Sequence, residues 1–366
     1  MTAAHSARLF LSRILIRHPT LCSCSNPTWL SFFGWQAPRL LYKLSFMPKD
    51  IAIIGAGVSG LTSGIVLAER GYQTAIFAKE AGQQTTSGAA AAVWFPYDAQ
   101  PAEKVIPWAL ETYQALVDLC RDPCAGVSMI ELRQFSRTGE IQIPAWAHSL
   151  GASVIPSENA SPARTKESRE FTSGYAITVP LMDTTIYLDY LANRFQKAGG
   201  SITVNARFEK PEDVPPESDL VINCAGIGAR ELVHDADLEP HRGQVAIVSK
   251  IDTLSCAIVC DDAPLMYAIP RANDCVFGGT NELSDNLDVD PRSTARILGE
   301  CSRVLEIEKP NVLAERVGLR PFRRSGVRLE RDRLRDGRIV IHNYGHGGAG
   351  FTLSWGSASD VLELAS

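Results

Sequence analysis

The sequence predicts an α/β fold in which distant stretches of chain build one parallel sheet, beside a second α+β domain with a mostly antiparallel sheet. An apolar, β-branched strand at 50–54 runs into a glycine-rich turn and then into a helical segment that stops at Gly71. Two more apolar strands, 201–205 and 219–223, follow much later in the chain. Alternating patterns typical of antiparallel strands lie at 244–248, 266–269 and 275–278.

The turn after the first strand has the spacing of a dinucleotide-binding motif. Gly55, Gly57 and Gly60 match G-x-G-x-x-G between a strand and a helix, and a second strand follows at 73–78. Glu80 lies about 20 residues past the last motif glycine, where an acid usually binds an adenosine ribose. This context favours a Rossmann-type domain with a bound dinucleotide over a plain βαβ turn.

Helices are expected at 107–120 and 184–197 from their apolar spacing. Near the C-terminus, a strand at 338–344 leads into a second glycine-rich loop and a helix at 353–364. The amides and the positive dipole end of such a helix can face a developing negative charge. A tight connection between strand and helix is the alternative explanation for these glycines.

Composition and charge exclude several classes of function. The net charge of −5, without a basic stripe, gives no reason to expect a nucleic-acid partner. The nine cysteines show no metal-ligand arrangement, so we expect no metal and mostly free thiols. No apolar stretch reaches the ~20 residues that a membrane span needs.

Residues 1–47 differ from the rest, because they contain arginine, serine, leucine and phenylalanine but no acidic residue. Two interpretations stay open: an organellar presequence, or a translation start at Met47. The first predicts a mitochondrial or plastid matrix, and the second a cytoplasmic protein. The chain ends in Leu364-Ala365-Ser366 and carries no peroxisomal Ser-Lys-Leu signal.

Further motifs lie along the chain from about residue 48 to 366. They are 85–87 with 90–97, 221–226, 242–244, 267–270, 318–321 and 342–356. Together with the first glycine motif they resemble the FAD-dependent D-amino-acid oxidases, a group that includes D-aspartate and glycine oxidases. The block His342–Gly348 is especially specific to these oxidases.

The resemblance implies FAD as cofactor and a set of residues that hold it. The pyrophosphate would lie against Ala56, Gly57, Val58 and Ser59, and the adenosine ribose against Lys79 and Glu80. Phosphate or flavin contacts would come from Thr85, Thr86, Ser87, Ala92 and Val93. Backbone contacts to the adenine half would come from Phe208 and Ala225. The isoalloxazine would be held by His346, Gly347, Gly350, Phe351 and Thr352.

The resemblance also implies three substrate contacts. Arg320 would bind the substrate carboxylate, Tyr267 would hydrogen-bond the same group, and the Gly348 carbonyl would accept from the amine. A planar guanidinium suits that role because it binds a carboxylate through two parallel hydrogen bonds. The alternatives are a structural salt bridge for Arg320 and a core position for Tyr267.

The expected reaction is oxidation of a D-amino acid by FAD and dioxygen, giving a 2-oxo acid, ammonia and hydrogen peroxide. Alternatives on the same fold are a D-aspartate oxidase and a glycine or sarcosine oxidase. A D-aspartate enzyme needs a further cation, and Arg271 and Arg324 are near only in sequence. Other classes are an NAD-linked dehydrogenase, which the late glycine block disfavours, and a flavin-binding protein without turnover. A homodimer is possible.

Three features depart from the family. The segment 261–266 is short and supplies no lid tyrosine, Phe95 replaces a polar residue near the flavin, and Lys79 replaces an acid. We expect the FAD-binding domain at 48–97, 180–230 and 316–366, and the substrate-binding domain at 98–179 and 231–315.

Overall fold

The computed structural model describes residues 50–156 and 171–366. The described residues belong to one compact unit. The expected presequence at 1–47 and the segment 157–170 lie outside the described residues.

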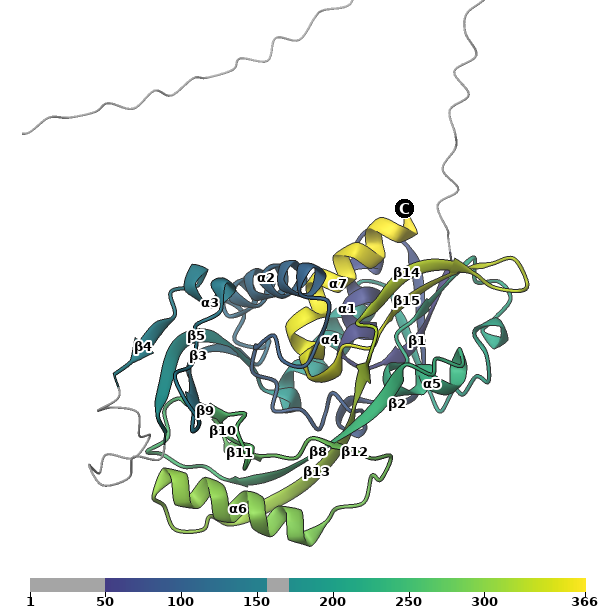
Figure 1. Ribbon diagram of the computed structural model, residues 1–366. Coiled ribbons are helices and arrows are strands. Elements are labelled where there is room, and N and C mark those ends of the chain that lie inside the picture. The colour runs from purple at the N-terminus through teal and green to yellow at the C-terminus, as the bar shows by residue number, and fades with distance from the viewer. Residues whose placement is uncertain (1–49, 157–170) are drawn as a thin grey trace, which may run out of the picture. The chain divides into compact units, whose positions relative to one another are not determined.

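One sheet has six strands in the order β14-β15-β7-β1-β2-β6 (Figure 1). The strands are β1 (Asp50–Ala56), β2 (Gln73–Ala81), β6 (Ser201–Val204), β7 (Leu220–Asn223), β14 (Arg328–Arg333) and β15 (Ile339–Tyr344). Only β14 is antiparallel to its neighbour. The central strand β1 pairs with β2 on one side and with β7 on the other, so segments about 150 residues apart meet at its carboxyl end.

The other sheet has nine strands in the order β12-β8-β11-β10-β9-β3-β5-β4, and β13 pairs with β8. The strands are β3 (Val127–Ser136), β4 (Ser153–Ile155), β5 (Ser173–Met182), β8 (Leu238–Ser249), β9 (Ala257–Cys260), β10 (Met266–Pro270), β11 (Asp274–Gly278), β12 (Glu282–Leu283) and β13 (Val312–Arg323). All pairs are antiparallel except β3 with β9.

Helices cover these sheets (Figure 1). They are α1 (Val58–Ala68), α2 (Ala102–Leu119), α3 (Ala145–Ser149), α4 (Thr184–Lys197), α5 (Ala229–Leu232), α6 (Pro291–Leu305) and α7 (Gly350–Ala365). Helices α1, α2, α4 and α7 share one hydrophobic core with β1 and with one face of the nine-stranded sheet, to which β3 and β5 contribute. Helix α6 packs on the other side of that sheet, against β8, β10 and β11. One core therefore joins the two sheets.

Helix α4 covers the predicted range, 184–197. The helix expected at 107–120 begins earlier, at Ala102, with Pro107 inside it. Its first turn is held by burial, since Val105 is only 2% exposed. The last helix likewise begins at Gly350, three residues before the expected start. The predicted domain boundary at 316 falls inside β13, and the domain boundaries stay a prediction.

Helix α1 approaches α4 so closely that only glycine fits at position 64. A Cβ there would lie 2.8 Å from Cε2 of Phe195 and 3.3 Å from Cδ1 of Ile53, and both side chains are fully buried. Overpacking of this kind usually costs about 1–3 kcal/mol.

We therefore expect Gly64→Val to lower the free energy of unfolding by about 2 kcal/mol or more. Gly299 is the matched control, because it is exposed on α6 and no atom lies within 4 Å of its Cβ position. Gly299→Ala should stabilise the protein by about 0.5–1 kcal/mol through helix propensity. Urea unfolding measures both, and equal effects of the two changes would contradict the packing described here.

Candidate active site

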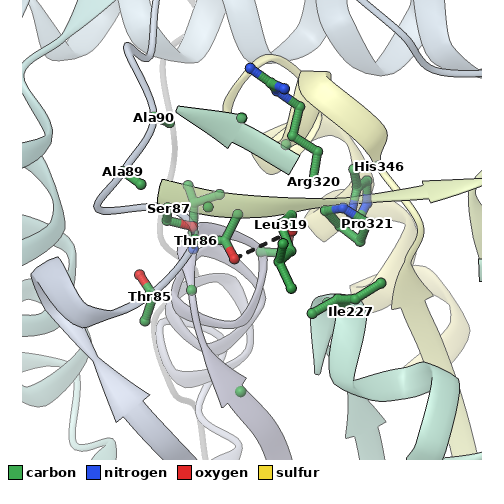
Figure 2. Close-up of a pocket in the computed structure, with 18 of the residues that line it drawn as sticks. Thr85, Thr86, Ser87, Ala89, Ala90, Ile227, Leu319, Arg320, Pro321 and His346 are labelled. Atoms are coloured by element: carbon green, nitrogen blue, oxygen red, sulfur yellow. Dashed lines mark hydrogen bonds between the residues drawn. The ribbon is translucent and has the colours of Figure 1, made fainter. Parts of the chain in front are cut away.

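A cavity of about 1080 Å³ runs from the carboxyl end of the six-stranded sheet to the face of the nine-stranded sheet that packs on α1, α2, α4 and α7. Figure 2 shows part of its lining, where the Thr86 hydroxyl donates to the Leu319 carbonyl beside Arg320. Every site residue expected from the sequence lines this cavity. These are Ala56, Gly57, Val58, Ser59, Lys79, Glu80, Thr85, Thr86, Ser87, Ala92, Val93, Phe208, Ala225, Tyr267, Arg320, His346, Gly347, Gly348, Gly350, Phe351 and Thr352.

The N-terminus of α1 faces the cavity because the turn before it packs tightly on β7. Gly55 has φ +108°, and a Cβ there would overlap the Cys224 carbonyl. A Cβ on Gly60 would overlap the Gly55 carbonyl. The helix begins after Gly57, which has no capping side chain, and its first turn contains no acid. Backbone amides and the positive dipole end of a helix suit a phosphate group.

The loop at 85–87 closes over this helix end. The Ser87 hydroxyl accepts a hydrogen bond of 3.0 Å from the Val58 amide, across 29 residues of sequence. Charged side chains lie farther along the cavity. Lys79 pairs with Glu80 at 3.1 Å, and Arg230 pairs with Asp285 at 2.8 Å. Glu80 therefore lies in the cavity lining at the end of β2, where an adenosine ribose is expected.

A second helix, α7, also begins at the cavity. The Thr352 hydroxyl in its first turn donates to the Phe95 carbonyl at 2.9 Å and lies 3.0 Å from the Phe95 amide. His346 precedes this helix, and its Nε2 lies 3.0 Å from Oδ1 of Asn343. Burial lowers the pKa of His346 to about 4, so the ring is neutral near pH 7. The N-terminus of α7 thus offers its amides and dipole to the cavity without a cationic histidine.

Arg320 lies where the cavity meets the nine-stranded sheet. Its Nη1 donates to the Thr280 carbonyl at 2.9 Å and approaches Oδ1 of Asn281 at 3.4 Å. No carboxylate in the described ranges forms an ion pair with it. A Cβ on Gly243 would lie 2.6 Å from Cζ of Arg320. The glycine therefore makes room for a guanidinium that lacks an anionic partner.

Tyr267 lies on β10, where it pairs with Val259 of β9 and Gly278 of β11. Its side chain is close to Arg320 of β13. A Cβ on Gly279 would lie 2.8 Å from the Tyr267 hydroxyl oxygen. The absence of side chains at 278 and 279 therefore leaves the space that the Tyr267 ring occupies. Burial raises the pKa of Tyr267, and the nearby Arg320 acts in the opposite direction. The phenol therefore stays protonated at neutral pH and can donate a hydrogen bond.

The lining includes residues that the sequence did not single out, notably Tyr97, Asp261 and Leu265. Asp261 and Leu265 belong to the short segment between β9 and β10, so this segment reaches the cavity without a tyrosine. Val259 and Asp261 are two residues apart and therefore point to the same face of the strand. This spacing is the sequence signal that could have placed Asp261 in the cavity lining. Within the described chain, neither Arg271 nor Arg324 lines the cavity. Arg271 pairs with Asp274 at 2.6 Å, and Arg324 with Glu239 at 3.3 Å.

A cavity with two helix N-termini, and with an arginine that has no ion-pair partner in the described chain, fits FAD together with a small acid substrate. The glycine turn leaves space where a side chain would block the approach of a pyrophosphate. These features define the class of flavin-dependent oxidoreductases.

Comparison with known proteins gives the same class. The model of the FAD-dependent oxidoreductase family matches residues 50–364, and the chain belongs to this family. It is 37% identical over 320 residues to a D-amino-acid oxidase of Rubrobacter xylanophilus, covering 86% of this chain and 94% of that one. It is 31% identical over 333 residues to a human D-aspartate oxidase, with 86% and 94% covered.

Among solved structures, a glycine oxidase from Geobacillus kaustophilus superposes with a TM-score of 0.72 at 17% identity. The match covers 87% of this chain and 94% of that chain. It shows that the fold is shared. In the part of the chain that the structure describes, no helix is long and apolar enough to cross a membrane.

The low pKa of His346 predicts how the stability of the apoprotein depends on pH. Because the unfolded histidine binds a proton near pH 6.5 and the folded one only near pH 4, stability contributed by the neutral ring is lost as pH falls through this window. His346→Gln should reduce the slope of unfolding free energy against pH by about 1.4 kcal/mol per pH unit there. Urea unfolding at several pH values measures this slope. The exposed His148→Gln is the control, and identical slopes in all three proteins would contradict the prediction.

Proposed function

We propose that this chain is a D-amino-acid oxidase. It oxidises a D-amino acid to an imino acid, which water hydrolyses to a 2-oxo acid and ammonia, while dioxygen is reduced to hydrogen peroxide. The observation that carries the proposal is the guanidinium of Arg320, which lines the same cavity as the dinucleotide motif and has no ion-pair partner in the described chain. The D-amino-acid oxidases among its relatives support the same activity.

FAD, when bound, supplies the hydride acceptor and passes the electrons to dioxygen. In the proposal, the amides at Ala56–Ser59 bind the pyrophosphate and Glu80 binds the ribose. The Ala225 and Phe208 backbones line the adenine half, and Gly347 and the start of α7 receive the flavin ring. The remaining contacts come from Lys79, Thr85, Thr86, Ser87, Ala92, Val93, His346, Gly350, Phe351 and Thr352.

The protein orients the substrate by its carboxylate. Arg320 binds both carboxylate oxygens in parallel, which fixes the plane of the group. The protonated Tyr267 donates a third hydrogen bond, and the Gly348 carbonyl accepts from the amine. These contacts hold two substituents of Cα, the carboxylate and the amine. Because the Cα–H must face the cofactor, the side chain has one remaining direction, and only one hand of the amino acid meets all of these conditions.

A second activity, D-aspartate oxidation, has less support. It requires another cation for the side-chain carboxylate. Within the described residues, Arg320 is the one cation that the nine-stranded sheet and its adjoining loops contribute to the cavity lining. The same part of the lining holds the anionic Asp261 instead.

Anaerobic mixing of the yellow holoprotein with single amino acids tests the function. Bleaching of flavin absorbance by D- but not L-amino acids is the expected result. Bleaching by glycine or sarcosine alone would assign the chain to that other activity. No bleaching by any of these compounds would leave a flavin-binding protein without turnover and would overturn the proposal.

Two parts of the proposal concern assembly and location. A homodimer stays a prediction, which light scattering of the purified protein can measure. Location stays a prediction as well: cytoplasmic for a start at Met47, or an organellar matrix for a presequence. The N-terminus of the mature protein, read by mass spectrometry, separates these two.

Arg320→Leu removes the proposed carboxylate contact. Loss of one partner from a buried charged pair costs about 2–5 kcal/mol, so KM for a D-amino acid should rise about 100-fold or more. The rate of flavin reduction should also fall, because the substrate is no longer held in one orientation. Bound FAD should be retained, as measured by the ratio of absorbance at 450 and 280 nm. Near-normal turnover would remove Arg320 from the site.

Gly243→Ala tests the same contact without removing the charge. Its Cβ would lie 2.5 Å from Nη1 of Arg320, so the guanidinium must shift, and kcat/KM should fall about tenfold or more. Gly139→Ala is the control, since nothing lies within 4 Å of its Cβ position on an exposed turn. An unchanged kcat/KM in Gly243→Ala would contradict the geometry of the site.

A further inference from the structure

Asp261 places a carboxylate on the side of the cavity that holds Tyr267 and Arg320. It directly follows β9, whose Val259 pairs with Tyr267. Val259 and Asp261 are two residues apart and both line the cavity, as expected for neighbours on one face of a strand. Leu265, at the other end of the same short segment, also lines it.

This carboxylate has no counter-ion within the described ranges. Its one hydrogen-bond partner there is the Gln134 side chain, whose Nε2 donates at 3.0 Å. The adjacent Asp262 differs, because it accepts from the Arg137 amide at 2.6 Å and from the Ser136 hydroxyl at 2.8 Å. Asp262 thus stabilises the turn through hydrogen bonds. Asp261 instead lines the cavity and has no ion-pair partner in the described chain.

Asp261 is exposed where it borders the cavity. Desolvation by the surrounding protein nevertheless raises the pKa of its carboxyl, against the opposing hydrogen bond from Gln134. The ionised form therefore lacks part of the solvation that it would have in water. A cation bound nearby would restore this loss, and an anion would add to it.

Two observations place Asp261 within reach of a substrate side chain. The phenol of Tyr97 is influenced by Asp261, which raises its pKa, and by Arg320, which lowers it, so both charges lie near one ring. A smaller cavity of about 310 Å³ shares Tyr97, Asp261 and Leu265 with the large one. Arg296 also lines the smaller cavity, where it pairs with Glu282 at 3.9 Å and not with Asp261. Asp261 therefore lies where the two cavities adjoin, on the same side as the proposed carboxylate site.

We propose that Asp261 forms a subsite for a cationic substrate side chain, so that the enzyme selects D-lysine, D-arginine and D-ornithine and rejects D-glutamate and D-aspartate. This inference rests on the proposed function. With Arg320 holding the α-carboxylate, a long side chain extends from Cα toward the Asp261 carboxylate. The two charges of the site thereby match the two charged ends of the substrate.

The test uses substrates matched in shape: D-lysine with D-norleucine, and D-glutamate with D-glutamine. Their dissociation constants and reduction rates are measured by anaerobic stopped-flow in the FAD-loaded protein. In Asp261→Asn, the ratio of kcat/KM for D-lysine over D-norleucine should fall about tenfold, equivalent to about 1.4 kcal/mol. Asp261→Arg should reverse the charge preference and favour D-glutamate over D-glutamine.

Asp252→Asn is the matched control, because it makes the same change in net charge at an exposed position outside both cavities. Its ratios should equal those of the unmodified protein. If the Asp261 variants fail to fold, the unmodified protein still tests the proposal. Raising ionic strength should then weaken the binding of D-lysine but not of D-norleucine.

Equal ratios in the unmodified protein and in Asp261→Asn would overturn the subsite while leaving D-amino-acid oxidation intact. Salt-independent binding of D-lysine would do the same. If neither D-lysine nor D-norleucine reduces the flavin but another D-amino acid does, the subsite alone is overturned. If no D-amino acid reduces the flavin, the proposed function falls together with the subsite. The two failures are therefore distinguishable.

Discussion

The contact between α1 and α7 is the constraint on which the site depends. The Thr62 hydroxyl lies 3.0 Å from the Ser354 carbonyl, joining residues 292 positions apart. It also lies 2.9 Å from the Val58 carbonyl of its own helix. Because the two helices are fixed against each other, their N-termini open on the same cavity. The proposed phosphate site and the proposed flavin site, one at each N-terminus, are therefore held at a fixed separation by this helix contact.

The local parts of this arrangement could be predicted from sequence. The strand, turn and helix at 50–68 follow from apolar patterning and from glycines that the close approach to Cys224 requires. Helix α4 follows from its own periodicity and from the glycines after it. The family motifs also pointed to cavity residues. Some of these motifs lie at a strand end or a helix start, and others, such as 242–244 and 318–321, lie within β8 and β13. The positions of Arg320, Tyr267 and the dinucleotide turn in one cavity agree with that expectation.

The parts that could not be predicted depend on contacts between distant segments. Strand β13 carries Arg320 but pairs with β8 in the nine-stranded sheet, a choice that no local pattern encodes. The Ser87 bond to Val58 and the room that Gly243 leaves for Arg320 are likewise visible only in three dimensions. The sequence places Asp261 in a short segment between two strands, but only the structure shows that it lines the cavity and has no ion-pair partner among the described residues.

The charges of the cavity fit the proposal that its two ends bind different groups. The proposed dinucleotide end offers helix dipoles and backbone amides, which can bind a phosphate without a buried side-chain charge. The substrate end instead holds Arg320 and Asp261, two charges that lack ion-pair partners within the described chain. Arg320 is half-buried. A charge that lacks an ion-pair partner at such a site is costly, and a ligand with a carboxylate offsets this cost.

A crystal structure of the holoprotein with a bound D-amino acid, obtained under anaerobic conditions, tests the central claim most directly. The account predicts the α-carboxylate on Arg320 through two parallel hydrogen bonds, within hydrogen-bond distance of the Tyr267 hydroxyl. A carboxylate bound elsewhere in the cavity, with Arg320 still directed only at Thr280 and Asn281, would contradict it.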